Sequence, residues 1–148
     1  ATGQRIRGYL APALTHTART LDLIAEHDFW YSCDLFQDDQ PQPLKTRTGQ
    51  LVSMPYSHEV NDVSGYSVMG LDPWRYADIL KRHFDQLLAE GRESGTVMCI
   101  PLHAYLVSQP NRFRAFESAL EHILGHRDEV WFATGSEIAA HYREHCWD

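Results

Sequence analysis

The chain has 148 residues, of which 43% are hydrophobic and 22% are charged, and its formal net charge is −7; these values are typical of one folded globular domain rather than a disordered chain. The excess of acidic residues excludes a general nucleic-acid binder, which needs a basic surface. No apolar run is long enough to span a membrane, and residues 1–20 show no signal-peptide pattern, although the chain begins at Ala1 rather than at Met.

The first half of the chain combines short apolar runs with one helical pattern. Runs rich in aromatic and β-branched residues predict buried strands, and Leu21, Ile24 and Ala25 share one face of a predicted helix. In chain order, the predictions are a strand at 5–10, a helix at 17–26, a strand at 29–32, a loop at 34–50, a strand at 51–54 and a loop at 56–70. Loops of this length in a compact domain are usually functional or disordered.

Residues 73–90 carry the strongest helix signal. Asp72 is a candidate N-cap, Pro73 suits the first turn, and Gly91 provides a stop. The apolar run that follows, residues 96–103, predicts a buried strand.

Pro110 opens another predicted helix, which ends at Gly125, and its apolar stripe with Phe113 and Phe116 predicts core packing. The last two predicted elements are a strand at residues 130–133 and a helix that begins at the capping box of Thr134 and Glu137.

This alternation predicts an α/β fold with a mostly parallel sheet and outer helices, in a single domain over residues 1–148. In such folds, functional side chains gather where the strands end. His103 ends its predicted strand, Asp34 and residues 56–59 follow theirs, and Pro12 follows the first.

His103 is the sharpest catalytic candidate, because an imidazole titrates near neutral pH and can donate or accept a proton. The alternative is a structural histidine bonded to a loop carbonyl. Asp34, Asp38 and Asp39 also have two interpretations. They could hold a metal or raise one another's pKa, or they could simply form a polar, turn-rich loop.

Two histidine pairs, His122 with His126 and His141 with His145, have the i, i+4 spacing that can chelate a metal on a helix. A histidine near a helix C-terminus is also favoured by the helix dipole alone, and we prefer this second interpretation.

The three cysteines, Cys33, Cys99 and Cys146, include no CxxC pair. A disulfide framework or a cysteine-based zinc site is therefore not expected, and a cytoplasmic location is predicted. The sequence also lacks the GxSxG, P-loop and GxGxxG motifs.

Five further segments are informative when they are taken together. They are residues 8–15 (GYLAPALT), 34–41 (DLFQDDQP), 51–62 (LVSMPYSHEVND), 102–103 (LH) and 131–138 (WFATGSEI). In this order they resemble the C-terminal half of a polysaccharide-deacetylase (NodB-homology) domain, nearest to the branch of metal-independent allantoinases. The resemblance implies half of an irregular (β/α) barrel and the hydrolysis of non-peptide carbon–nitrogen bonds.

The resemblance also implies roles for individual residues. His103 is the general acid that protonates the leaving nitrogen, and Leu102 lines the acyl pocket. The other implied substrate-binding residues are Pro12, Asp34, Glu59, Asn61 and Asp62.

The sequence departs from the family pattern in ways that bear on cofactors. The motif with the catalytic-base Asp and the His-x-x-x-His metal motif have no counterpart here, and the resemblance places both in an N-terminal half. The Arg of the family's third motif is missing from residues 9–12, and Leu35 stands where a Trp is expected. No metal is therefore expected in this chain; a zinc-like divalent metal is implied only if the other half carries Asp-His-His ligands.

The expected partners follow from the same resemblance. Half of a barrel leaves open sheet edges, so we expect an N-terminal half or another copy of the chain to cover them. The expected ligand is a small molecule or an N-acetylated sugar, with no nucleic-acid or membrane partner. The alternatives are a catalytically incomplete fragment that binds a carbohydrate or ureide, and, more weakly, an unrelated doubly wound α/β domain.

Overall fold

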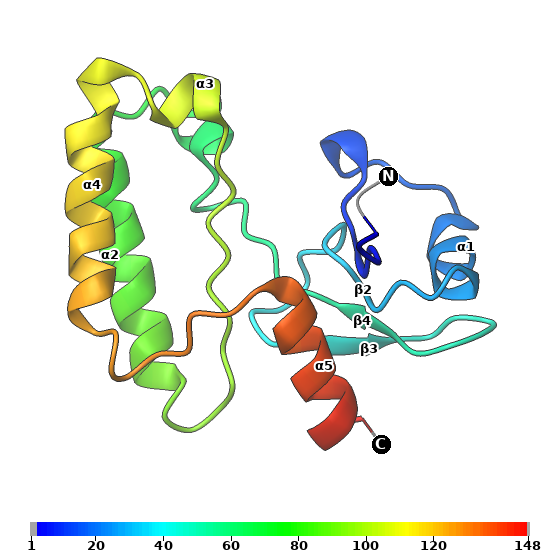
Figure 1. Cartoon of the computed structure of the whole chain (residues 1–148). Helices are drawn as coiled ribbons and strands as arrows, with labels where there is room; N and C mark the ends of the chain where they lie inside the picture. Colours follow the sequence, from blue (N-terminus) through cyan, green and yellow to red (C-terminus); the bar gives the residue numbers. More distant parts are fainter. Residues whose placement is uncertain (1–2, 148) are drawn as a thin grey trace. The chain divides into compact units, whose positions relative to one another are not determined.

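The computed structural model describes residues 3–147, which divide into two compact units. One unit comprises the described parts of Ala1–Pro55 and Ala133–Asp148, and the other is Tyr56–Phe132. Figure 1 labels most of the helices and strands of both units.

The first unit contains an open four-stranded sheet. Its strands are β1 (Gly8–Tyr9), β2 (Tyr31–Ser32), β3 (Gln42–Leu44) and β4 (Leu51–Ser53). The spatial order is β1-β2-β4-β3, in which β2 pairs in parallel with β1 and β4, while β3 is antiparallel to β4. The prediction of a mostly parallel sheet is therefore confirmed, whereas a barrel stays a prediction.

Strand β4, in the interior of this sheet, is apolar and buried. Leu51 and Val52 are fully buried, and Leu51 packs with Ile24 and Ala25 of helix α1 (Thr20–Glu26). Helix α5 (Gly135–His145) contacts β2. An apolar strand between helices is the usual arrangement in parallel sheets.

The start of α5 is the predicted capping box. Glu137 N–H donates to Thr134 Oγ1 over 3.3 Å, and Thr134 N–H donates to the Glu137 carboxylate over 2.7 Å. The hydrogen bonds that this carboxylate accepts from Thr134, first from the backbone N–H and then from the hydroxyl over 2.8 Å, lower the pKa of Glu137. Two of the unpaired N–H groups at the helix start are thereby satisfied.

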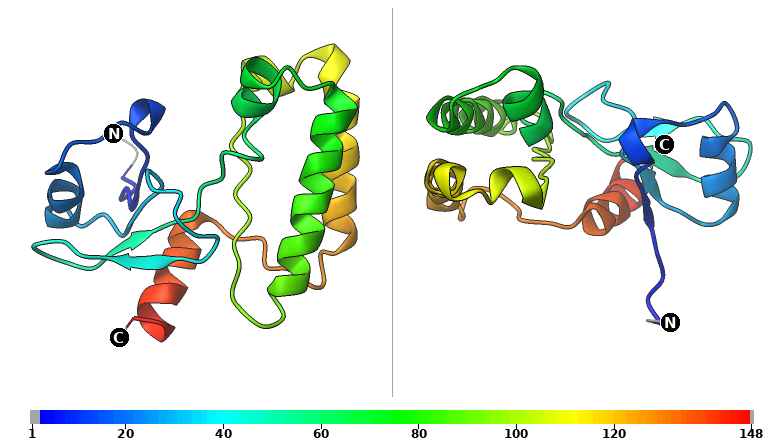
Figure 2. Two further views of the ribbon diagram at one scale, coloured as in Figure 1. Left: turned by 180° about the vertical axis from the view of Figure 1, so that it is seen from behind. Right: turned by 90° about the horizontal axis from the view of Figure 1, so that it is seen from above.

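The second unit is built on two long helices that lie side by side, α2 (Pro73–Glu90) and α4 (Pro110–Gly125), as Figures 1 and 2 show. A short helix, α3 (Ala104–Val107), and a π-helical segment, η2 (Val63–Val68), complete it. As predicted, Asp72 caps α2, accepting a 2.9 Å hydrogen bond from Trp74 N–H. The buried core of this unit consists of Val60, Tyr66, Tyr76, Ala77, Leu80, Val107, Ala115, Phe116 and Ala119.

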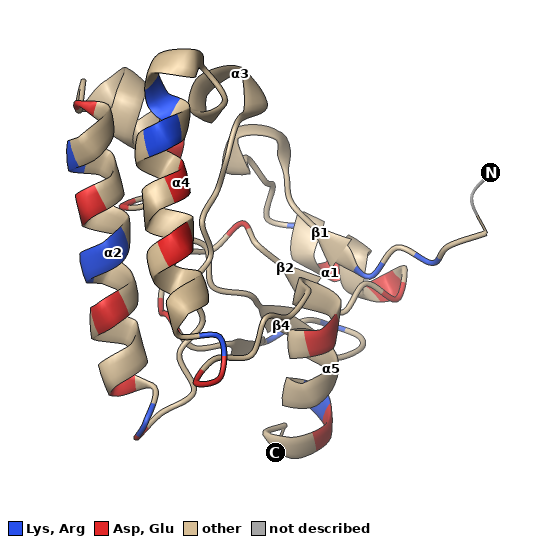
Figure 3. Cartoon of the chain, turned by 60° about the vertical axis from the view of Figure 1, so that its left-hand side comes forward, with Lys and Arg blue, Asp and Glu red and all other residues tan. Residues whose placement is uncertain are grey.

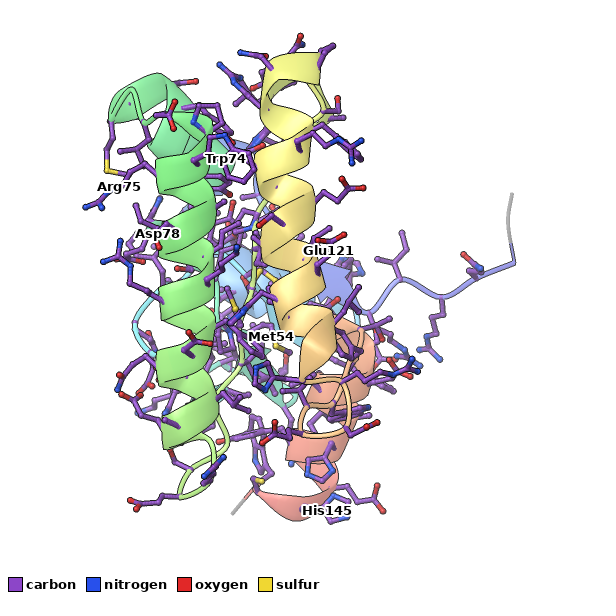
Figure 4. All side chains as sticks on the ribbon, turned by 90° about the vertical axis from the view of Figure 1, so that its left-hand side faces the viewer. Met54, Trp74, Arg75, Asp78, Glu121 and His145 are labelled. Atoms are coloured by element: carbon purple, nitrogen blue, oxygen red, sulfur yellow. The ribbon has the colours of Figure 1, made fainter. Side chains whose placement is uncertain are left out.

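The outer faces of these helices carry charges of both signs (Figure 3). Figure 4 shows Arg75 and Asp78 projecting from the flank of α2 that is turned away from α4, and Arg82 forms an ion pair with Asp78. Among the described helices, none combines the length and the apolar character that crossing a bilayer requires.

The core prediction for α4 is right for one of its two phenylalanines. Phe116 is buried, but Phe113 is 49% exposed. Ala115 and Ala119 are buried beside Phe116, and these small side chains let α4 approach α2 closely. The contact face of α4 is therefore centred on residues 115–119, and Phe113 lies at its margin.

Two predicted strands, 96–103 and 130–133, are absent from the described structure. In the first segment, Met98 and Ile100 pack against the core of the second unit without joining a sheet. In the second, Trp131 and Phe132 are largely exposed. Both predictions were wrong because apolar residues favour burial, whereas a strand also needs a neighbour to pair its backbone groups.

Candidate functional site

His103 is held by the buried carboxylate of Asp62. Asp62 Oδ1 lies 2.7 Å from His103 Nδ1, and Asp62 Oδ2 accepts a 2.7 Å hydrogen bond from the His103 backbone N–H. The Asp62 side chain is fully buried, whereas the His103 side chain keeps 37% of its exposure. One carboxylate therefore fixes both the backbone and the ring of His103.

This contact decides which ring nitrogen is available for chemistry. A carboxylate only accepts hydrogen bonds, so Nδ1 carries the proton that points at Asp62. Nε2 is then the nitrogen that faces away from Asp62. When the ring takes up a second proton, on Nε2, that proton is free to be transferred.

The surrounding backbone sets this geometry. Asp62 N–H donates to Pro101 O over 3.2 Å, so the segment that leads into η2 lies against the segment that ends at His103. The His103 carbonyl accepts from the N–H groups of Leu106 and Val107, which begins α3. His103 is thus anchored on both sides within the second unit.

Tyr76 of α2 supports the same loop from the core. Its hydroxyl donates a 2.8 Å hydrogen bond to the carbonyl of Val60, and both residues are fully buried. Burial raises the pKa of Tyr76, so its phenol remains a neutral donor. Gly65 of η2 packs on this ring, and a Cβ there would lie 2.8 Å from Tyr76 Cδ2.

The other predicted residues of this unit differ in exposure. Asn61 is buried, accepts from Val63 N–H over 2.8 Å and donates to the Tyr56 hydroxyl over 3.2 Å. Glu59 is exposed and accepts from Ser57 Oγ over 3.0 Å. Its pKa is lowered, first by its own backbone N–H and then by Ser57.

Two exposed apolar side chains adjoin His103. Leu102 is 44% exposed and precedes it directly. The ring of Tyr105, which sequence reasoning did not single out, meets the His103 ring edge to face at 5.6 Å and is 67% exposed. The described surface beside the imidazole is therefore apolar and open.

Pro12 and Asp34 lie in the first unit. Asp34 is buried, and its Oδ1 accepts a 2.7 Å hydrogen bond from Ala11 N–H. Its Oδ2 is also buried and has no hydrogen-bond partner among the described residues. Buried carboxylate oxygens normally have donors, so Oδ2 marks an acceptor position that this part of the chain leaves open.

The turn at Pro12 has unusual backbone geometry. Ala13 and Leu14 have φ values of 53° and 56°, the left-handed region that residues with a Cβ rarely adopt. Such conformations persist only where neighbouring structure enforces them, and they gather at functional sites. The predicted substrate-binding roles of Pro12 and Asp34 stay predictions.

Within residues 3–147, one group of three side chains could hold a metal ion. Asp85 of α2, His122 of α4 and His126, which directly follows α4, have ligand atoms within 4.8 Å of one another. No such group forms around His103 in the described chain. Asp38 instead accepts from Gln40 N–H and from the Gln42 amide, which supports the turn interpretation of that acidic loop.

The spacing of His122 and His126 is visible in the sequence, whereas Asp85 is not connected to them there, because it belongs to another helix. The residues near His103 do not fit a metal centre, since both oxygens of Asp62 are engaged by His103. A metal at the catalytic centre implied by the family would therefore need ligands from outside this group.

Comparison with known proteins gives structural matches. No family model and no curated protein matches the sequence. A solved structure from Pseudomonas aeruginosa PAO1, described as a probable polysaccharide deacetylase, is 31% identical with a TM-score of 0.87, over 99% of this chain and 50% of its own. PuuE allantoinase is 29% identical with a TM-score of 0.87, over 98% of this chain and 48% of its own.

A third structure, from Mycobacterium smegmatis, is provisionally assigned as a polysaccharide deacetylase. It is 28% identical with a TM-score of 0.78, over 93% of this chain and 49% of its own. The chain thus spans about half the length of each solved structure. The chain is similar to solved structures described as polysaccharide deacetylases and to PuuE allantoinase, and it matches half of each, consistent with the C-terminal half that its sequence motifs resemble.

Proposed function

We propose that this chain supplies the general-acid part of the active site of a hydrolase that cleaves non-peptide carbon–nitrogen bonds, of the deacetylase or allantoinase kind. The observation that carries the proposal is the buried Asp62 carboxylate, which holds His103 through Nδ1 and directs Nε2 away. The solved structures similar to the chain support the reaction class.

The proposed reaction is an ordinary amide-type hydrolysis. A carboxylate from the other half of the barrel takes a proton from water as the water oxygen bonds to the carbonyl carbon. The tetrahedral anion then expels its nitrogen, and the Nε2 proton of doubly protonated His103 passes to that nitrogen as the C–N bond breaks. The products are an acid and an amine, and His103 keeps the Nδ1 proton that points at Asp62.

A metal is not needed for the roles proposed for this chain. If the other half holds a zinc-like ion, the ion would polarise the carbonyl oxygen. The residues described here would act on the opposite side of the reaction, at the leaving nitrogen.

Substrate binding is assigned to residues that the family resemblance indicates and, in addition, to Tyr105. Leu102 and Tyr105 offer exposed apolar surface beside His103. In this proposal, Asn61 and Glu59 shape the loop beside His103. Pro12 and Asp34 contribute to substrate binding from the first unit. The proposed substrate is a small ureide or an N-acetylated sugar.

The partner in this proposal is the complementary half of the barrel, or a second copy of this chain. The support is the coverage of about half of each similar structure, together with the two edge strands of the sheet, β1 and β3. Edge strands present unpaired backbone groups that another chain can pair.

The decisive experiment is His103→Ala in the complete assembly. Loss of a general acid should lower kcat by about 10²–10⁴-fold with the fold intact, measured with allantoin and with an N-acetylated oligosaccharide. His27→Ala, at an exposed histidine after α1, is the matched control and should keep full activity. Equal kcat values for the His103 variant and the parent protein would overturn the proposal.

The second candidate function is binding without catalysis, favoured by the exposed Tyr105 ring beside His103. Aromatic faces are common in small-molecule binding sites. Under this alternative, the complete assembly would bind sugar or ureide with no turnover, and Tyr105→Ala would weaken binding while His103→Ala would not.

A further inference from the structure

Side-chain hydrogen bonds connect helices α2 and α4 at a regular spacing. Lys81 Nζ donates to Ser118 Oγ over 2.6 Å, and the next pair along the helices is Asp85 with His122, where Asp85 Oδ1 lies 2.6 Å from His122 Nε2. The residues of each pair are 37 positions apart in the sequence. A constant separation means that the two helices run in the same direction in register, so Asp85 and His122 are at the same level.

The second histidine of the group, His126, caps the C-terminus of α4, four residues beyond His122. His126 and His122 have ring centroids 5.5 Å apart, and both rings lie against Phe84 of α2, at 5.5 and 5.9 Å. The ligand atoms of Asp85, His122 and His126 fall within 4.8 Å of one another. Phe84 is thus an apolar neighbour of both imidazoles, while the side chains of Asp85, His122 and His126 keep 53%, 32% and 35% of their exposure.

His126 is held by the carboxylate of Glu129, which is not one of the three candidate ligands. His126 Nδ1 lies 2.8 Å from Glu129 Oε1, and this contact is the first cause of the lowered pKa of Glu129. Because Nδ1 is engaged, Nε2 of His126 is the nitrogen available to a ligand. A carboxylate that orients a histidine through its other nitrogen is a recurrent feature of metal sites.

From this geometry we propose that Asp85, His122 and His126 form a divalent-metal site of the Zn²⁺ class that joins α2 to α4. Two imidazole nitrogens and one carboxylate oxygen are zinc ligands, and water would complete the tetrahedron. Zinc between Asp85 and His122 requires roughly 3.3 Å between their ligand atoms, which is a small widening of their present contact and within reach of these partly exposed side chains.

The function of this site is structural. The ion bridges two helices whose packing forms the core of the second unit. Because it binds the folded protein, it raises thermal stability by an amount that grows with the logarithm of the free metal concentration above Kd. The site does not include His103, and it stands whether or not the proposed hydrolase function holds.

The test is Zn²⁺ titration of the full 148-residue chain by calorimetry, together with Co²⁺ substitution, which gives visible absorption bands when the metal is tetrahedral. The parent chain should bind one Zn²⁺ and gain thermal stability. His122→Ala/His126→Ala should lose the binding and the stability gain. Glu129→Gln should weaken binding by about 10-fold, because Glu129 orients one ligand without being one.

The matched control is His141→Ala/His145→Ala, which removes the other i, i+4 histidine pair. Those rings stack at 4.4 Å on α5, and His145 Nδ1 lies 3.0 Å from His141 O, with no third ligand grouped with them in residues 3–147. This variant should bind Zn²⁺ as the parent does. No binding by the parent, or binding that survives in the His122/His126 variant, would overturn the site.

Discussion

The two oxygens of Asp62 contact two different atoms of His103, the backbone nitrogen and ring Nδ1. Both atoms are hydrogen-bond donors, so the site requires two acceptors at position 62. Asparagine offers one acceptor and one donor. An amide at this position would leave one N–H of His103 without its partner, or would select the wrong tautomer of the ring.

We therefore predict that Asp62→Asn in the complete assembly lowers kcat on the order of 10²-fold, within the range of a disabled general acid, with a smaller change in KM. The pH dependence of kcat should shift, because Asp62 acts through the charge and tautomer of His103. Kinetics across pH, together with circular dichroism, measure these effects.

Asp78→Asn is the control for this substitution, since Asp78 is an exposed residue of α2 that pairs with Arg82. It should leave kcat and its pH profile unchanged. If Asp62→Asn behaves in the same way as this control, Asp62 is not a positioning residue.

Among the helices and loops, α2 has a second role besides its packing on α4. Through the bond from Tyr76 to the carbonyl of Val60, it anchors the loop that carries Asp62. The carbonyl is buried with Val60, so loss of the phenol leaves an acceptor with no donor. An unsatisfied buried polar group costs more than the net gain from a single hydrogen bond.

Tyr76→Phe should therefore destabilise the protein by about 1–3 kcal/mol, as measured by urea denaturation. Tyr105→Phe, at an exposed tyrosine, should change stability little. A Tyr76 variant as stable as the parent would show that the bond to Val60 does not hold this loop.

The same residue predicts a pH dependence. Burial raises the pKa of Tyr76 above its ordinary value of 10.0, so the folded state favours the neutral phenol. The stability that the folded state gains by keeping this phenol neutral is fully present below pH 10.0 and is lost as the pH rises further. Stability should fall above that pH, less steeply in Tyr76→Phe than in the parent; buried Tyr66, whose pKa is also raised, should preserve part of the slope.

At the scale of the whole molecule, the chain covers about half of each similar structure. Its described sheet ends at β1 and β3, and large apolar side chains, including Trp131 and Phe132, are more than half exposed. Surfaces of this kind commonly mark contacts with another polypeptide.

We predict that the chain alone has no hydrolase activity and that adding the complementary half of a related barrel restores it. Native mass spectrometry should detect the resulting complex, or a homo-oligomer if a second copy takes that place. A monodisperse monomer that hydrolyses substrate unaided would contradict this prediction.

The signals that worked in the sequence were local. Asp72 with Pro73 and the capping box at Thr134 located the starts of α2 and α5, because cap contacts join residues two or three positions apart. His103 was selected as the end of a strand; the strand is absent, yet the histidine stands directly before α3.

What the sequence by itself determined was therefore the set of long helices, the mostly parallel sheet and the candidate imidazole. Tertiary structure alone decided which side chains meet. The partner of His103 lies 41 positions away, and the acid beside His122 lies 37 positions away. Residue spacing along one helix or strand predicts which side chains are neighbours on that element. Contacts between elements depend on how the chain folds back on itself, which the spacing does not contain. Whether residues 96–103 pair as a strand depends on the same non-local geometry.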